Sequence, residues 1–172
     1  MRYQVRIPDD LDKDRYISGK AALNLPAPEE TSGDWHFINT FYTDRPKEVF
    51  IAGRNGKVDT NAVWGNFGVY PCKQALARRN LQGGEHAYAA NHFRAILDLL
   101  YESLQKNRFP GHLQGASEEY LDTPEQKSLL LEKARILFPF LSSKQRELLD
   151  RWLKAEQKLV CELKIVIGNL LN

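Results

Sequence analysis

Apolar and polar positions alternate along residues 2–70 with the period of two that is typical of β-strands. The segment RYQVRIP near the start has apolar residues at every second position, namely Tyr3, Val5 and Ile7. Residues 34–43, DWHFINTFYT, are rich in aromatic and β-branched residues on both faces, so a central strand is predicted there. A third apolar run, EVFIAGR, is followed by Asn55-Gly56. This dipeptide is a strong hairpin signal, and it predicts a return strand within residues 57–70.

From Pro71 onward, the period of the apolar positions changes to that of an α-helix. Proline suits the first helical turn, because its missing N–H is not needed there, so PCKQALARRN predicts a short helix. A longer helix is predicted over residues 85–107, which carry an apolar stripe at spacings of three and four. TPEQ at Thr123 and SSKQ at Ser142 have the form of capping boxes. Each predicts the start of another helix, and the last helix is expected to run almost to the end of the chain.

Strands that precede helices predict an α+β fold rather than an alternating α/β fold. We expect an N-terminal antiparallel sheet of about three to five strands in residues 2–70, followed by a helical part with about three to four main helices. The chain of 172 residues has the length of one domain. Because no linker composition appears, we predict a single domain over residues 1–172, with a soft boundary near residue 110 and a helical subdomain over 111–172.

Composition and charge are those of an ordinary soluble protein. Apolar residues make up 42% of the chain, charged residues 27%, and the net charge is +2. Residues 51–115 carry the basic excess, with 8 Lys or Arg against 4 Asp or Glu. No run approaches the length of about 18 apolar residues that a membrane helix needs, and the polar start MRYQVRIPDD is unlike a signal peptide. We therefore expect a cytoplasmic protein with no membrane partner and with reduced cysteines.

Two residues are candidates for catalysis, Cys72 and His92. Cys72 lies at the predicted start of a helix, where the helix dipole lowers the pKa of a thiol, and a histidine such as His92 could act as its base. The alternative is a small buried residue at a strand-to-helix junction. His86 and His92 are six residues apart, whereas a helical pair of metal ligands needs a spacing of four. We expect no metal and no cofactor, and the sequence contains neither a phosphate-binding loop nor a nucleophile elbow.

Basic and aromatic residues alternate in the middle of the chain and form the candidate binding site. Its members are Arg54, Trp64, Tyr70, Lys73, Arg78 and Arg79. Such a group can form the hot spot of a protein interface, can stack bases and hold phosphates of a nucleic acid, or can be core aromatics with charges outside. Gly65 and Gly68 interrupt the predicted return strand, which indicates a bulge or a close approach of another group. The apolar stripe of the last predicted helix could contact a second copy of the chain, which would give a homodimer.

Three segments, ISGKAALNLPAPEETSGDWHF, NFGVYPCKQAL and YAANHFRAILDLLYESL, resemble the small bacterial proteins encoded beside nucleotidyltransferase-like toxins of the abortive-infection type. They cover about 50 of the 172 residues. The resemblance implies an antitoxin-like protein that binds and restrains a toxin-type enzyme, and it assigns no site residue. We expect a non-enzymatic interaction protein. The alternatives are a nucleic-acid-binding protein that uses the basic and aromatic residues, and an enzyme that depends on Cys72 or His92.

Overall fold

The computed structural model describes the backbone of residues 1–170, and all side chains in that range except those of residues 163, 164 and 167–170. The strands are β1 (Tyr3–Gln4), β2 (Arg15–Ile17), β3 (Tyr42–Thr43), β4 (Ile51–Gly53), β5 (Val69–Pro71) and β6 (Tyr88–Ala90). The helices are α1 (Gly19–Leu23), α2 (Phe37–Phe41), α3 (Asn61–Trp64), α4 (Lys73–Arg78), α5 (His92–Gln105), α6 (Ala116–Glu119), α7 (Pro124–Arg135) and α8 (Ser143–Leu170), with 3-10 turns η1 (Gly111–Leu113) and η2 (Phe138–Phe140).

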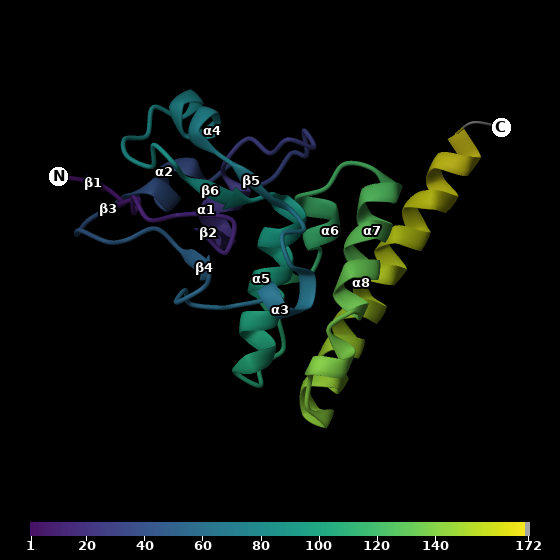
Figure 1. Ribbon diagram of the computed structural model, residues 1–172. Coiled ribbons are helices and arrows are strands. Elements are labelled where there is room, and N and C mark those ends of the chain that lie inside the picture. Colours follow the sequence, from purple (N-terminus) through teal and green to yellow (C-terminus); the bar gives the residue numbers. More distant parts are fainter. Residues whose placement is uncertain (171–172) are drawn as a thin grey trace.

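The predicted α+β class is confirmed, with strands in the N-terminal part and long helices after them. Figure 1 shows the short strands and helices on one side of α5, and α6, α7 and α8 on the other side. β1 and β3 form a two-stranded sheet, and a second sheet has the order β4-β2-β6-β5. All pairs are antiparallel except β2 with β6, where Ile17 lies opposite Ala89 in a parallel pair. The sheet therefore differs from the prediction in one pair, and it includes a strand beyond residue 70.

The prediction of a central strand over residues 34–43 is wrong. The chain forms the short helix α2 there, and only its last two residues extend into β3. A helix places Phe37 and Phe41 on one face, and their ring centroids are 5.2 Å apart. Phe41 is fully buried. The five-residue helix therefore turns both phenylalanines toward the core, with Phe41 buried and Phe37 half-buried, and leaves Ile38 and Asn39 exposed.

The helix predicted from Pro71 and the helix predicted from residue 85 both begin later. Pro71 ends β5, an edge strand of its sheet, where a residue without an N–H is tolerated. The chain then forms β6 before α5 begins at His92. Asn91 is the N-cap of α5, because its side chain accepts a hydrogen bond of 2.9 Å from the N–H of Arg94. An asparagine at this position is among the strongest helix start signals.

The turn predicted at Asn55-Gly56 is present, but the return strand is not. The N–H of Gly53 donates to the carbonyl of Val58 at 2.8 Å across the turn, and Asn55 has the positive φ of 56° that such turns need. β4 pairs with β2 in the sheet instead. The chain after the turn continues into α3, which carries it toward the helices.

Both predicted capping boxes are confirmed. In α7 the hydroxyl of Thr123 accepts from the N–H of Gln126, and the Gln126 side chain accepts from the N–H of Thr123. Ser142 and Gln145 make the same reciprocal bonds at the start of α8. The last helix runs to Leu170, as the apolar stripe predicted. At 28 residues it is more than twice as long as the 12-residue α7.

A buried carboxylate attaches α8 to α6. Glu156 is fully buried and accepts from the N–H of Gly115 at 2.6 Å and from the N–H and hydroxyl of Ser117. These groups lie at the N-terminus of α6, where backbone N–H groups lack partners within the helix. One turn earlier on the same face of α8, Trp152 is buried and donates to the carbonyl of Leu113 at 3.0 Å.

The larger hydrophobic core surrounds α5. All residues from His92 to Leu100 are buried, and the core contains residues from Tyr16 to Val160, on both sides of residue 110. A smaller core lies under the N-terminal strands and includes Cys72. Among the described residues, no helix has the length and apolarity needed to cross a membrane.

Candidate functional site

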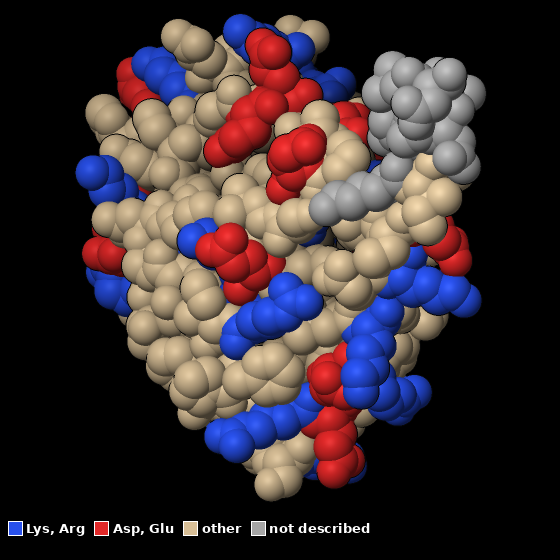
Figure 2. Space-filling model, turned by 90° about the vertical axis from the view of Figure 1, so that its right-hand side faces the viewer, with Lys and Arg blue, Asp and Glu red and all other residues tan. Residues whose placement is uncertain are grey.

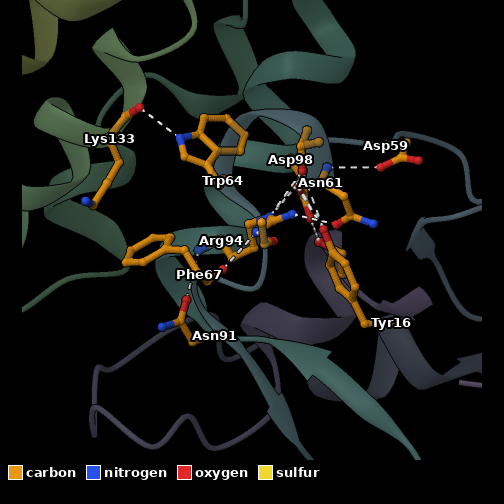
Figure 3. A network of polar contacts seen from close by, with 12 residues as sticks. Tyr16, Asp59, Asn61, Trp64, Phe67, Asn91, Arg94, Asp98 and Lys133 are labelled. Atoms are coloured by element: carbon orange, nitrogen blue, oxygen red, sulfur yellow. Dashed lines mark hydrogen bonds and ion pairs between the residues drawn. The ribbon is translucent and has the colours of Figure 1, made fainter. Parts of the chain in front are cut away.

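The densest group of polar side chains lies inside the protein, around Arg94 of α5 (Figure 3). Arg94 is fully buried, and all three of its nitrogens donate hydrogen bonds. Nε donates to Asp98 and to Thr60, each at 3.1 Å. Nη2 donates to Asn61 at 3.0 Å. Nη1 donates to the carbonyls of Gly65 and Phe67 at 2.9 and 2.8 Å, which connects α5 to the segment that follows α3.

Asp98 is the counter-charge of Arg94 and is also fully buried. Its carboxylate accepts from the hydroxyls of Ser18 at 2.6 Å and Thr60 at 2.5 Å, in addition to Arg94. Burial raises the pKa of Asp98, whereas Arg94 and the two hydroxyls lower it. Because Ser18 precedes α1 and Thr60 precedes α3, this one carboxylate joins two N-terminal segments to α5.

Two aromatic rings enclose the guanidinium of Arg94. Its central carbon lies 5.2 Å from the ring centroid of Tyr16 and 5.6 Å from that of Trp64, within the range of a cation–π contact. Burial raises the pKa of the Tyr16 hydroxyl. The indole N–H of Trp64 donates to the carbonyl of Lys133 at 3.1 Å, so Trp64 also connects this network to α7 (Figure 3).

The close approach predicted at Gly65 and Gly68 occurs at Gly68, where the approaching group belongs to the protein itself, whereas a Cβ on Gly65 would meet no atom within 4 Å. A Cβ on Gly68 would lie 2.5 Å from the side-chain oxygen of Asn91 and 2.8 Å from Arg94. Gly68 also has a φ of 71°, which favours glycine. The glycine therefore makes room for the start of α5.

The network around Arg94 holds the fold together and offers no group to a substrate. Both charged partners are fully buried, and each polar atom of Arg94 and Asp98 has a partner within the protein. Neither residue was among the sequence candidates. The signal that could have found them is the spacing of four between an arginine and an aspartate in an otherwise apolar helix, which brings the two onto one face.

Cys72 does not have the environment of a reactive thiol. It is fully buried in the smaller core, and burial raises its pKa to about 12. The helix that follows it, α4, has only six residues. The predicted lowering of the thiol pKa is therefore wrong, because loss of hydration outweighs the dipole of so short a helix.

His92 is also buried, and both nitrogens of its ring are used. Nε2 lies 2.8 Å from the carbonyl of Leu25, which can only accept, so Nε2 carries the proton. Nδ1 lies 2.6 Å from the hydroxyl of Thr31, from which it accepts. Burial lowers the pKa of His92. The ring holds the loop between α1 and α2 against α5. Among the residues that the structure describes, no group of three or more His, Cys, Asp or Glu is placed to bind a metal ion.

The residues of the predicted binding site do not form one surface. Trp64 is buried, and Arg54 pairs with Asp12 at 2.6 Å. Lys73, the first residue of α4, pairs with Glu85 at 3.6 Å. Tyr70, Arg78 and Arg79 also lie on α4 or within a few residues of it.

Tyr70 and Arg78 line a hollow whose other walls include two prolines, Pro26 and Pro28. The Tyr70 ring is half-buried, and its hydroxyl donates to the carbonyl of Pro26 at 2.9 Å. Arg79 lies over the ring of Phe37 at 5.2 Å. The basic end of α4 therefore lies beside α2.

The most exposed large aromatic residue of the described chain lies just before α2. Trp35 is 80% exposed, and Ile38 of α2 is 60% exposed. The ring of His36 lies 3.9 Å from that of Trp35, and His36 is itself held by the buried Asp34 at 2.7 Å. We call Trp35 and Ile38 the tryptophan surface. The aromatic content of residues 34–43 predicted a buried strand, so this exposed surface was not expected from the sequence. A helical pattern through Phe37 and Phe41 would have left Trp35 and Ile38 off the buried face.

Comparisons of the chain with models of protein families, with curated proteins and with solved structures found no match.

The buried ion pair of Arg94 and Asp98 should contribute much more to stability than an exposed ion pair with the same spacing of four residues. Arg94→Met leaves Asp98 buried without its counter-charge and should lower the free energy of unfolding by about 3–5 kcal/mol. Urea denaturation measures this loss. The double variant Arg94→Met/Asp98→Leu should regain part of it, because neither charge then remains unpaired.

The control is the exposed pair of Glu102 and Lys106 on the same helix, which are also four residues apart. Lys106→Met should cost at most about 0.5 kcal/mol, because water and salt screen an exposed pair. Equal losses for Arg94→Met and Lys106→Met would show that the buried pair has no special role.

The lowered pKa of His92 predicts that stability falls in mild acid. The unfolded chain binds a proton at His92 below its ordinary pKa of about 6.5, whereas the folded chain does not. The free energy of unfolding therefore decreases as the pH falls through that value. His92→Gln should make stability depend less on pH between about 7.5 and 5, as measured by urea denaturation at each pH.

Two other histidines make this comparison specific. The pKa of His112 is also lowered, chiefly by burial. Because the original protein and His92→Gln both contain His112, its contribution cancels when their pH profiles are compared. His86 is exposed, and His86→Gln is the matched control for the effect of replacing a histidine by glutamine. A His92→Gln profile that coincides with the original would contradict this account.

Proposed function

We propose that this chain is a non-enzymatic bacterial interaction protein of the cytoplasm, which binds and restrains a partner protein. The observation that carries the proposal is the exposure of Trp35, at 80%, together with that of Ile38, at 60%, in one short segment. Tryptophan is among the residues most enriched in the hot spots of protein interfaces. The tryptophan surface combines it with an exposed isoleucine three positions further along the chain.

The tryptophan surface is also prepared for binding. Asp34 is buried and bonded to both the N–H and the ring of His36, and the His36 ring stacks on Trp35. Phe37 packs on Phe41 on the inner side of the same segment. A large ring that is oriented before binding loses little conformational entropy when a partner covers it.

The state of the two candidate catalytic residues supports a binding role. Cys72 and His92 are buried, the thiol pKa is raised to about 12, and the imidazole is bonded to Leu25 and Thr31. Both act as parts of the core. The partner we propose is a toxin-type enzyme, on the basis of the resemblance in residues 17–37, 66–76 and 88–104. The mechanism is steric: the tryptophan surface covers a site that the partner needs.

Replacement of Trp35 tests this proposal. The tagged protein should copurify from its native host with the product of a neighbouring gene, and that product should be harmful when expressed alone. Trp35→Ala should weaken the complex at least about 30-fold, as loss of a hot-spot residue does. Its thermal unfolding should be unchanged, because the ring is outside the core. Phe140→Ala removes another exposed ring, on η2, and should bind normally.

Three outcomes would overturn the proposal. The first is a protein that is recovered alone while the neighbouring gene is harmless without it. The second is equal binding by the original protein and Trp35→Ala. The third is recovery of nucleic acid in place of a protein, with an affinity that falls steeply with salt as phosphate contacts release counterions.

We include in the proposal a homodimer through α8. Helix α8 extends well past the end of α7 (Figure 1), and its Ile165 and Val166 are 63% and 55% exposed. Figure 2 shows the side of the molecule with α7 and α8, where acidic side chains gather near the top, and basic side chains with a few acidic ones among them lie at the lower right. A two-fold axis across this side would place the acidic part of each copy against the basic part of the other.

Analytical ultracentrifugation tests the dimer. The original protein should sediment as a dimer at micromolar concentration, and Ile165→Glu/Val166→Glu should sediment as a monomer, because buried carboxylates without partners oppose association. Phe140→Glu changes an exposed apolar residue outside the contact and should leave the dimer intact. A monomeric original protein would exclude the dimer and would leave the proposal for Trp35 unaffected.

A further inference from the structure

A hollow of about 240 Å³ lies where α1, α2 and the segment before β4 meet. Three lysines from three separate segments line it: Lys20 of α1, Lys47 before β4, and Lys57 in the turn after β4. The polar side chains around it are those of Asn39, Thr40, Thr43 and Glu48. No sequence motif predicted this group, because its members are up to 37 residues apart and only the fold brings them together.

The positive charge of this lysine hollow is not neutralised within the described part of the chain. None of its three ammonium groups lies within ion-pair distance of a carboxylate there. Its one carboxylate, that of Glu48, is bonded to Arg6. Asp34, whose pKa the Lys20 charge helps to lower, is bonded to His36. The nearby acids are thus engaged by other cations.

The positive charge of Lys20 also acts on His112. Burial lowers the pKa of His112, and the charges of Lys20 and Lys106 lower it further. Several cations therefore gather around this part of the surface. Like charges in one hollow repel each other, and an anion that entered would relieve the repulsion. A group with two negative charges matches three lysines best.

The other wall of the lysine hollow is apolar and well fixed. Val49, Phe50 and Leu99 line it. A Cβ on Gly19 would lie 3.1 Å from the Phe50 ring, so the ring packs directly on that backbone, and Gly19 has a φ of 60°. Lys57 lies over the same ring, with its nitrogen 5.3 Å from the centroid. A ligand in the hollow would therefore meet a fixed apolar wall with the Lys57 ammonium beside its aromatic ring.

From these contacts we propose that the lysine hollow binds a small organic phosphate. Lys20, Lys47 and Lys57 hold the phosphate by charge-assisted hydrogen bonds, and the exposed amide of Asn39 adds a neutral donor. The organic part lies against Phe50 and its apolar neighbours. A hollow of about 240 Å³ admits a small molecule and cannot enclose a nucleic-acid duplex. This site uses none of the residues of the tryptophan surface, so the failure of either proposal would leave the other unaffected.

A titration followed by NMR tests the site with defined probes. Phenyl phosphate carries both the dianion and an aromatic ring, inorganic phosphate carries only the anion, and phenol carries only the ring. Phenyl phosphate should shift the backbone amides of Lys20, Asn39 and Lys57 in a saturable way. Inorganic phosphate should shift the same amides with weaker affinity, and phenol should shift none.

A matched pair of triple variants separates a site from general attraction to a positive protein. Both variants lose the same charge and three exposed lysines that have no ion pair among the described residues. Replacing the hollow lysines by glutamine, as Lys20→Gln/Lys47→Gln/Lys57→Gln, should weaken phenyl phosphate binding roughly tenfold or more. The control Lys13→Gln/Lys144→Gln/Lys158→Gln should change it by about twofold at most, since screening limits the effect of distant charges.

Four results would overturn the inference. They are an absence of saturable shifts at these amides, equal weakening in the two triple variants, shifts with phenol as large as those with phenyl phosphate, and inorganic phosphate that binds as tightly as phenyl phosphate. The last result would assign the hollow to free phosphate. Thermal unfolding of both variants shows whether they are folded, and Lys57→Gln alone provides a milder change in which a smaller loss of affinity is still expected.

Discussion

Arg94 and Asp98 carry opposite charges inside a protein core, and most of the N-terminal architecture is arranged to satisfy them. A buried charge without partners is far more costly than an exposed one. Arg94 therefore donates hydrogen bonds to the carbonyls of Gly65 and Phe67 and to the side chain of Asn61. Asp98 accepts hydrogen bonds from the hydroxyls of the residues just before α1 and α3. Segments that are too short to be stable alone are positioned by these bonds. The tryptophan surface and the lysine hollow are both built on segments that adjoin this frame.

Polar side chains inside this protein and those at its surface differ in whether the protein itself supplies their partners. Buried polar residues such as His92 and Glu156 each hold one segment to another. Both of these side chains are fully occupied within the protein and are not available to a ligand. Among the side chains that lie at the surface without such bonds in the described part of the chain are Trp35 and the three lysines around the hollow. Function is therefore to be sought where the fold leaves side chains unsatisfied.

Local signals in the sequence predicted the helical part well. Thr123 and Ser142 begin helices because their capping bonds involve residues three positions away, which any chain with this sequence can form. The turn at Asn55-Gly56 is equally local. The segment with Trp35 was predicted wrongly, because aromatic content favours a strand only where a neighbouring strand is available to pair with it. Trp64 was assigned to a surface for a similar reason, since nothing near it in sequence shows that Lys133 will accept its hydrogen bond.

The sequence by itself determined the α+β class, the order of strands before helices, the capped starts of α7 and α8, and the length of the last helix. These depend on periodicity and on contacts within a few residues. Only the tertiary structure decided that Cys72 and His92 belong to the core, that Trp35 is exposed, and that three lysines share one hollow. Each of these depends on segments that are distant in sequence and meet in space. The burial of a side chain is a property of its neighbours in the fold, and it sets the pKa, the hydrogen bonds and the accessibility on which chemistry depends.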